Sequence, residues 1–91
     1  MGNWRKKINV KDLWAKYEKD GNFQEFKVAL IETLNAAKEE IAEVVDEDEM
    51  FNYEDLIEEI SATEDEEEFD DAWQNFYDWA DANNIWIATT L

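Results

Sequence analysis

The stretch NFQEFKVALIETLNAAKEEIAEVV, residues 22–45, decides the fold. Its apolar side chains recur every three or four positions, the spacing that gathers them on one face of a helix. Asn22 followed by Glu25 has the pattern of a capping box, and Gly21 is typical of the end of a preceding helix. The spacing therefore predicts a helix over 23–45 with a single buried stripe. The members of this stripe are Phe23, Phe26, Leu30, Leu34, Ala37, Ile41, Val44 and Val45.

The two ends of the chain have the character of strands. Apolar and polar residues alternate over 4–10, and the closing segment 85–91 is rich in β-branched and aromatic residues. The two segments are therefore candidates to pair with each other. Between the first of them and the long helix, Asn9 is expected to cap a short helix over 10–19.

Two further helices are expected downstream of the long one. The acidic run 46–49 is interpreted as a solvated connection, and Asn52 is expected to cap a short third helix. Thr63 is expected to open a fourth helix over 64–83 through a second capping box. The predicted fold class is thus mainly α (α or α+β), with about four helices in one domain over 1–91. This fold class also allows a short two-stranded element that joins the N- and C-termini.

Composition excludes several classes of protein. Five Trp, five Phe and three Tyr in 91 residues are enough to build a core, which argues against an acidic disordered tail. No stretch approaches the roughly 18 apolar residues that span a bilayer, and no secretory signal is visible, so a cytoplasmic location is expected. Because the chain has no Cys and no His, disulfides, thiolate chemistry, imidazole bases and the usual zinc sites are excluded.

No enzyme or cofactor-dependent protein is expected either. There is no nucleotide-binding loop, and the carboxylates crowd together in polar stretches rather than beside the apolar wall that raises the pKa of a general acid. The run 46–49 resembles the start of a calcium loop, but Phe51 stands where that loop needs Gly and Ile57 where it needs Glu. No specific metal site is therefore predicted.

Charge is the most informative feature of the chain. The formal net charge is −17 at pH 7, which makes direct binding to nucleic acid or to an anionic membrane very unfavourable. All eight bases lie in residues 1–38 beside five acids, whereas residues 39–91 hold the other twenty acids and no base. The basic run Arg5, Lys6 and Lys7 is expected to neutralise part of the acidic face in the fold.

The predicted third and fourth helices carry acids opposite their apolar stripes, with no base within one turn. Nine acids over the roughly 30 Å of the fourth helix give about one charge per 3.3 Å, close to the spacing of phosphates along one DNA strand. Such a surface could occupy a basic groove built for nucleic acid. The simpler interpretation is a solvated face that keeps the protein in solution. The predicted acidic face consists of Glu54, Asp55, Glu58, Glu59, Glu67, Asp70, Asp71, Asp78 and Asp81.

Several aromatic residues border these acids. Most are expected to build the core, but one or two could anchor a partner protein as exposed hot spots. An adaptor that docks through such an aromatic patch, with the acids serving solubility, is therefore the alternative function. The candidate anchors are Phe51, Tyr53, Tyr77, Trp79 and Trp86.

Small size, strong acidity, lack of Cys and helical patterning resemble phage-encoded inhibitors that imitate DNA, of the anti-CRISPR and anti-restriction type. The closing segment DWADANNIWI, residues 78–87, is also similar to the ends of small phage proteins. The resemblance is one of type and carries no functional residue. It implies a non-enzymatic inhibitor in the host cytoplasm that blocks the nucleic-acid-binding surface of a basic protein.

Overall fold

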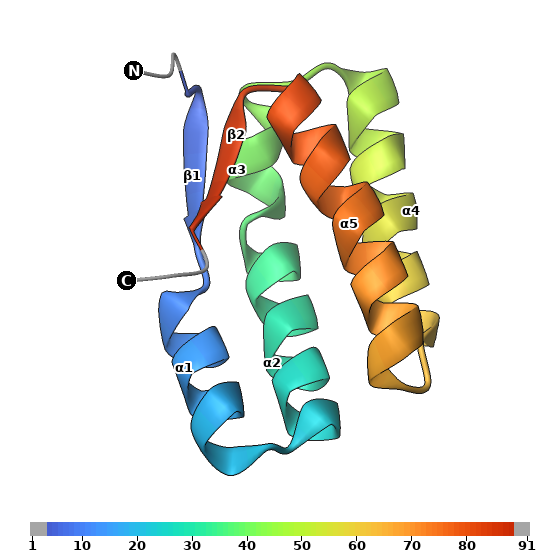
Figure 1. Ribbon diagram of the computed structural model, residues 1–91. Coiled ribbons are helices and arrows are strands. Elements are labelled where there is room, and N and C mark those ends of the chain that lie inside the picture. Colours follow the sequence, from blue (N-terminus) through green and yellow to red (C-terminus); the bar gives the residue numbers. More distant parts are fainter. Residues whose placement is uncertain (1–3, 89–91) are drawn as a thin grey trace.

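The computed structural model describes residues 4–88. In that part of the chain a helical body carries a small sheet at one end (Figure 1), so the mainly α fold with a terminal two-stranded element is confirmed. The elements in order are β1 (Lys6–Asn9), α1 (Lys11–Asp20), α2 (Phe23–Ala36), α3 (Lys38–Ala42), α4 (Glu47–Ala62), α5 (Glu66–Ala82) and β2 (Ile85–Ala88).

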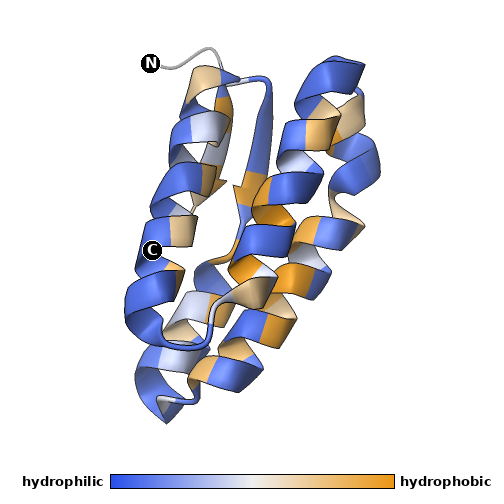
Figure 2. Cartoon of the chain, turned by 90° about the vertical axis from the view of Figure 1, so that its right-hand side faces the viewer, coloured by the Kyte–Doolittle hydropathy of each residue, from blue (hydrophilic) through white to orange (hydrophobic). Residues whose placement is uncertain are grey.

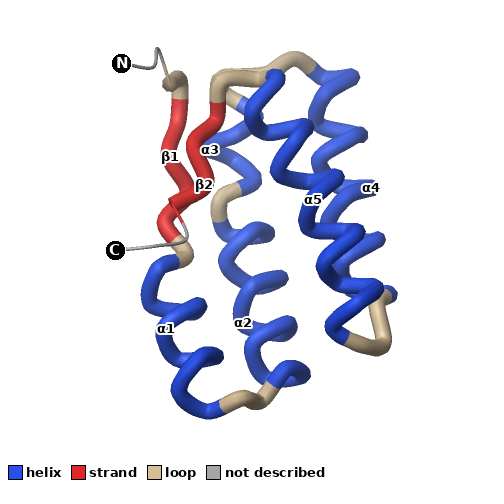
Figure 3. The backbone as a smooth tube through the Cα atoms, in the orientation of Figure 1, coloured by secondary structure: helices blue, strands red, loops and turns tan. Residues whose placement is uncertain are grey.

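The sheet joins the two ends of the chain. β1 and β2 run parallel, with Ile8 opposite Ile87, and they lie side by side in Figure 3. Ile8, Ile85 and Ile87 are buried against the helices, while Trp86 points outward and is exposed. The predicted pairing of the termini is therefore confirmed over these four-residue strands, and positions 89–91 lie outside the described residues.

The predicted helix over 23–45 is interrupted, which is why the described chain has five helices and not four. Ala37 has ψ −3°, which ends α2, and α3 follows at once. One turn earlier the Thr33 hydroxyl donates to the Ala29 carbonyl (3.0 Å), a bond that bends helices. Ile41, which lies in α3 after the break, is fully buried.

α4 begins one and a half turns before the predicted start. Asp46 is its N-cap, and the Asp46 carboxylate accepts a hydrogen bond from the Glu49 N–H (3.0 Å). The prediction of a solvated connection over 46–49 and of Asn52 as the cap was therefore wrong. The acidic run was misinterpreted because acids in the first turn of a helix are stabilised by the helix dipole and need no separate loop.

Of the other three predicted caps, two are shifted by one or two residues. Asp65, not Thr63, caps α5 by accepting from the Glu68 N–H (2.8 Å). Thr63 instead closes α4, with its hydroxyl donating to the Ile60 carbonyl (2.7 Å). Val10, not Asn9, is the N-cap of α1, and the Asn9 side chain accepts from the Lys11 N–H (3.0 Å) from one position before that cap. Only Asn22 caps the helix as predicted, accepting from the Glu25 N–H.

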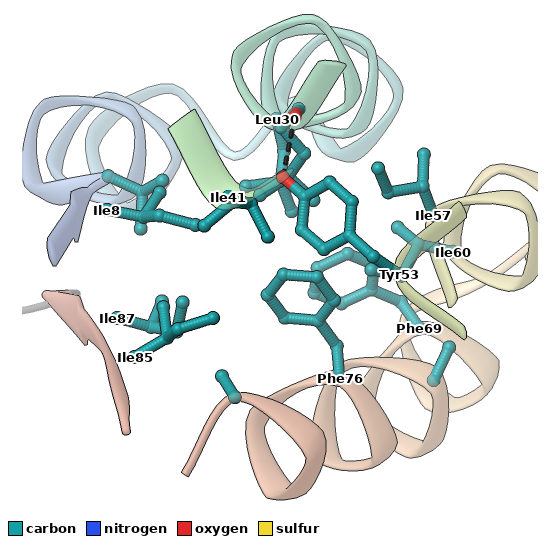
Figure 4. Packing of buried hydrophobic residues seen from close by; sticks show 14 of the residues in the cluster. Ile8, Leu30, Ile41, Tyr53, Ile57, Ile60, Phe69, Phe76, Ile85 and Ile87 are labelled. Atoms are coloured by element: carbon teal, nitrogen blue, oxygen red, sulfur yellow. Dashed lines mark hydrogen bonds between the residues drawn. The ribbon is translucent and has the colours of Figure 1, made fainter. Parts of the chain in front are cut away.

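The core lies between α2, α4, α5 and the sheet (Figure 4). Phe76 is fully buried and contacts the Tyr53 ring at a centroid distance of 5.7 Å. The Tyr53 hydroxyl donates to the Leu34 carbonyl (2.6 Å), which lies in the last turn of α2, where carbonyls lack intrahelical donors. This bond ties α4 to the break after α2. Figure 2 shows the result: hydrophobic residues face inward between helices whose outer sides are hydrophilic.

Candidate functional site

All nine residues of the predicted acidic face are exposed on two neighbouring helices. Four lie on α4 and five on α5. The two helices are joined by a short turn after residue 62, so they run in opposite directions side by side (Figure 1). Glu67, Asp71 and Asp78 lie on the side of α5 away from Phe69 and Phe76, at the roughly 100° per residue of a helix.

A shallow open groove on this surface consists of two adjoining hollows that share Glu59 and Ala62. One hollow lies on α4 alone and is lined by Asp55, Glu58 and Glu59. The other lies between α4 and α5 and is lined by Glu59 together with Glu68 and Asp71. Glu68 was missed from the sequence. It shares the helical side of Asp71 and Asn75, and its carboxylate accepts from the Glu64 N–H (2.9 Å). The groove brings these five carboxylates, the groove acids, onto one surface.

The remaining predicted acids extend this surface to both sides. Glu54 lies on the flank toward α3, where its carboxylate pairs with the Lys38 ammonium at 3.2 Å. Asp70 lies on the opposite flank, toward α1, where it and Glu66 face Tyr17. The nine acids therefore form a curved band across α4 and α5 and not a flat sheet. Of these nine, Glu54 alone forms an ion pair within the described residues.

The basic run at the N-terminus does not neutralise this band. Lys6 pairs with Glu40 in α3 (3.2 Å), Lys7 lies over the Trp86 ring, and the Arg5 guanidinium donates to the Val44 carbonyl (2.9 Å) just after α3. The expectation was therefore wrong for the predicted acidic face, and the basic run reaches the α3 end of the acidic region instead. Lys27 likewise donates to the Thr63 carbonyl (2.5 Å) at the end of α4.

These contacts have a common physical reason. α3 and α4 have no base in their last turns, so the negative ends of their dipoles are not offset locally. Arg5 and Lys27 come from the first third of the chain and donate to carbonyls near these two helix ends. These two bases therefore close helices instead of pairing with the acids of the band.

The candidate aromatic anchors divide into two groups. Tyr53 is fully buried, and Trp79 is half-buried with its indole N–H donating to the Glu49 carboxylate (2.6 Å), so both are structural. Their prediction as anchors was wrong because helical spacing places them on the core side of α4 and α5. Phe51, Tyr77 and Trp86 are exposed, by 60%, 43% and 46%.

Other kinds of site find no support in residues 4–88. There, no group of three or more acidic side chains is arranged to hold a metal ion. No helix in the same residues is long and apolar enough to cross a membrane. Compared with known proteins, the chain matches no family model, no curated protein and no solved structure.

Tyr17 provides a test of the charge at the α1 flank. A hydrogen bond to the Glu66 carboxylate, burial and the charges of Glu66 and Asp70 raise the pKa of Tyr17 to about 12. Because the folded state holds this proton more tightly than the unfolded chain, the associated stability is complete below about pH 10 and is lost as the pH rises toward 12.

Absorbance at 295 nm should show a tyrosine ionising near pH 12 that is missing in Tyr17→Phe. Glu66→Gln should move that ionisation toward pH 10, the ordinary value for tyrosine. An ionisation unaffected by Glu66→Gln would contradict the contact between α1 and α5.

Salt should stabilise this protein. Like-charge pairs one turn apart, such as Asp55 with Glu59 and Glu67 with Asp71, each cost about 0.2–0.5 kcal/mol and lack compensating bases. Raising the salt concentration from about 10 to 300 mM shortens the Debye length from roughly 30 Å to below 8 Å and screens this repulsion. We expect a higher melting temperature, measured by circular dichroism. A melting temperature that falls or stays constant would show that the band is not crowded.

Proposed function

We propose that the acidic band on α4 and α5 binds the nucleic-acid-binding surface of a basic partner protein and blocks it by imitating nucleic acid. The observation that carries the proposal is the groove, where Asp55, Glu58, Glu59, Glu68 and Asp71 are exposed together. No base of the described residues forms an ion pair with any of them. Such carboxylates are free to receive the Lys and Arg side chains that otherwise hold phosphates.

Rigid support favours this function over a merely solvated face. The N-terminus of each helix is closed by its own carboxylate, Asp46 in α4 and Asp65 in α5. The inner faces of the two helices are held by the core, through residues such as Ile57, Ile60 and Phe76. Carboxylates on pre-organised helices lose little conformational freedom on binding, which leaves more of the contact energy as affinity.

The concentration of one sign of charge in a single region argues against solubility as the sole role of the acids. A domain needs only a modest net charge to stay in solution, with both signs mixed over the surface. Here residues 39–91 hold twenty acids and no base, and the salt bridges within residues 4–88 reach only Glu40 and Glu54 among them. The resulting repulsion costs stability, so a binding role that uses the charge accounts for its retention better.

The test is capture of the partner followed by competition. The tagged full-length protein is incubated at low salt with extract of its natural host cell, and captured proteins are identified by mass spectrometry and purified. Binding is then measured between about 50 and 300 mM salt, with and without duplex DNA or RNA. The proposal expects a steep loss of affinity with salt and mutual exclusion with nucleic acid. A ternary complex, or affinity independent of salt, would overturn it.

The alternative, an adaptor that docks through aromatic side chains, has one observation in its favour. Phe51 is 60% exposed on the outer side of α4. An adaptor would bind with little dependence on salt and would lose affinity in Phe51→Ala. The imitation of nucleic acid instead predicts that Phe51→Ala leaves the salt dependence unchanged.

A further inference from the structure

The second feature of the surface is the open edge of the sheet. β1 pairs only with β2 in the described part of the chain, and its other edge faces outward (Figures 1 and 3). The Val10 N–H, directly after β1, donates to the Ala88 carbonyl of β2 (2.9 Å), as the register Asn9 opposite Ala88 requires. Because backbone groups alternate along a strand, Lys6 and Ile8 also face β2, whereas the N–H and C=O groups of Lys7 and Asn9 point away from it. They form a row ready to pair with another extended chain.

Beside this edge lies an exposed aromatic pair. The rings of Trp4 and Trp86 lie 5.7 Å apart, at 54°, and the two side chains are 40% and 46% exposed. The Lys7 ammonium lies 5.9 Å from the centre of the Trp86 ring. Together, Trp4, Lys7 and Trp86 form a surface, the tryptophan patch, that combines apolar area with positive charge. Large aromatic side chains with a neighbouring cation are typical of binding hot spots.

The charge of β1 determines which kind of strand can pair with its outer edge. β1 has the sequence KKIN and is preceded by Arg5, so the edge is positive on a protein whose net charge is −17. Lysines on an edge strand disfavour pairing with an identical strand, because antiparallel copies bring the lysines together. The same lysines attract an acidic strand, since opposite charges on paired strands are stabilising. A second copy of this chain is thus disfavoured and an acidic segment favoured.

We propose that the outer edge of β1 and the tryptophan patch form a second binding site, distinct from the acidic band, for an extended acidic segment of a partner protein. The segment adds to the sheet as a third strand through the outward backbone groups of Lys7 and Asn9. An acidic side chain of the segment meets Lys7, because Lys6 is already paired with Glu40, and an apolar side chain packs on Trp86. This site shares no residue with the acidic band, so a failure of either proposal leaves the other unaffected.

Titration of the full-length protein with a heptapeptide of alternating Glu and Val tests the proposal. Amide signals followed by nuclear magnetic resonance should shift most at Lys7 and Asn9, whose N–H groups gain partners, and their hydrogen exchange should slow. The amide of Val10, already bonded to Ala88, should change less. A matched heptapeptide with Lys in place of Glu should not bind. Absence of shifts with the acidic peptide at about 1 mM would overturn the proposal.

Two variants and a control locate the binding. Trp86→Ala and Lys7→Glu should each lower the affinity for the acidic peptide about tenfold or more, because each removes part of the tryptophan patch. Val28→Ala, an exposed position on α2, is the control and should bind unchanged. Oligothymidine is titrated in parallel, since stacking on tryptophan also suits single-stranded nucleic acid. Binding of oligothymidine but not of the acidic peptide would overturn the proposal, as would self-association through Trp86.

Discussion

Asp55→Asn, Glu59→Gln and Asp71→Asn, introduced together, will weaken binding to the nucleic-acid-binding partner about 100-fold or more. Each lost carboxylate removes charge-assisted hydrogen bonds, whose net worth is about 1.5–3 kcal/mol each. The three side chains keep their shape, and all are exposed in the groove, Asp55 in its hollow on α4 and Asp71 in its hollow between α4 and α5. Isothermal titration or displacement of labelled duplex DNA measures the loss. The dependence of affinity on salt should also become shallower.

A second triple variant provides the matched control. Glu18→Gln, Asp20→Asn and Glu32→Gln also remove three charges, from exposed sites on α1 and α2. If binding depended on net charge alone, both variants would lose affinity equally, and the groove would have no special role. The groove variant should in addition melt at a higher temperature than the natural protein, because it relieves like-charge repulsion on α4 and between α4 and α5. A lower melting temperature would mean that these carboxylates hold the fold together.

Phe76→Ala will have the largest effect on stability. Phe76 is fully buried, and its ring lies 5.4 Å from Trp73, 5.7 Å from Tyr53 and 6.1 Å from Trp79. Truncating a buried Phe costs about 3–5 kcal/mol through lost burial and the cavity left behind. A small domain is stable by only about 5–15 kcal/mol in total. Urea unfolding followed by circular dichroism should therefore show a greatly reduced midpoint.

Tyr77→Ala is the control for this prediction. Tyr77 is the next residue on α5 but is 43% exposed. Its truncation should change the free energy of unfolding by only about 0.5 kcal/mol. Equal losses in the two variants would contradict the assignment of the inner and outer sides of α5. Because the acids of the band depend on that assignment, the pair of variants also tests the site.

Local sequence signals were reliable where one physical cause dominated. Asn22 was recognised as a cap because its side-chain oxygen needs only the backbone N–H three residues on, whatever the rest of the fold does. The helical period over α5 similarly placed Phe69 and Phe76 inside, and Asp71 and Asp78 outside. The acids of the band were therefore found from the sequence alone, residue by residue.

Predictions failed where two local solutions competed. Asp46 could begin a loop or cap a helix, and the acidic run that follows suits either, so α4 was expected to begin too late. Tyr53 could be an exposed anchor or a core residue. With α4 beginning at Glu47, Tyr53 falls on the same side of the helix as Ile57 and Ile60, and its hydroxyl donates to the Leu34 carbonyl beside the break after α2. The break itself has no signal in the local pattern.

The amino-acid sequence by itself determined the helical class of this protein, its uncompensated negative charge and which side of α5 carries the acids. Periodicity and composition encode these properties locally. Only the tertiary structure decided that α4 and α5 lie side by side, so that Glu59 and Asp71 share a groove. It also decided that Arg5 and Lys27 donate to backbone carbonyls near distant helix ends. Such pairings depend on how helices pack to bury their apolar faces, a property of the whole chain.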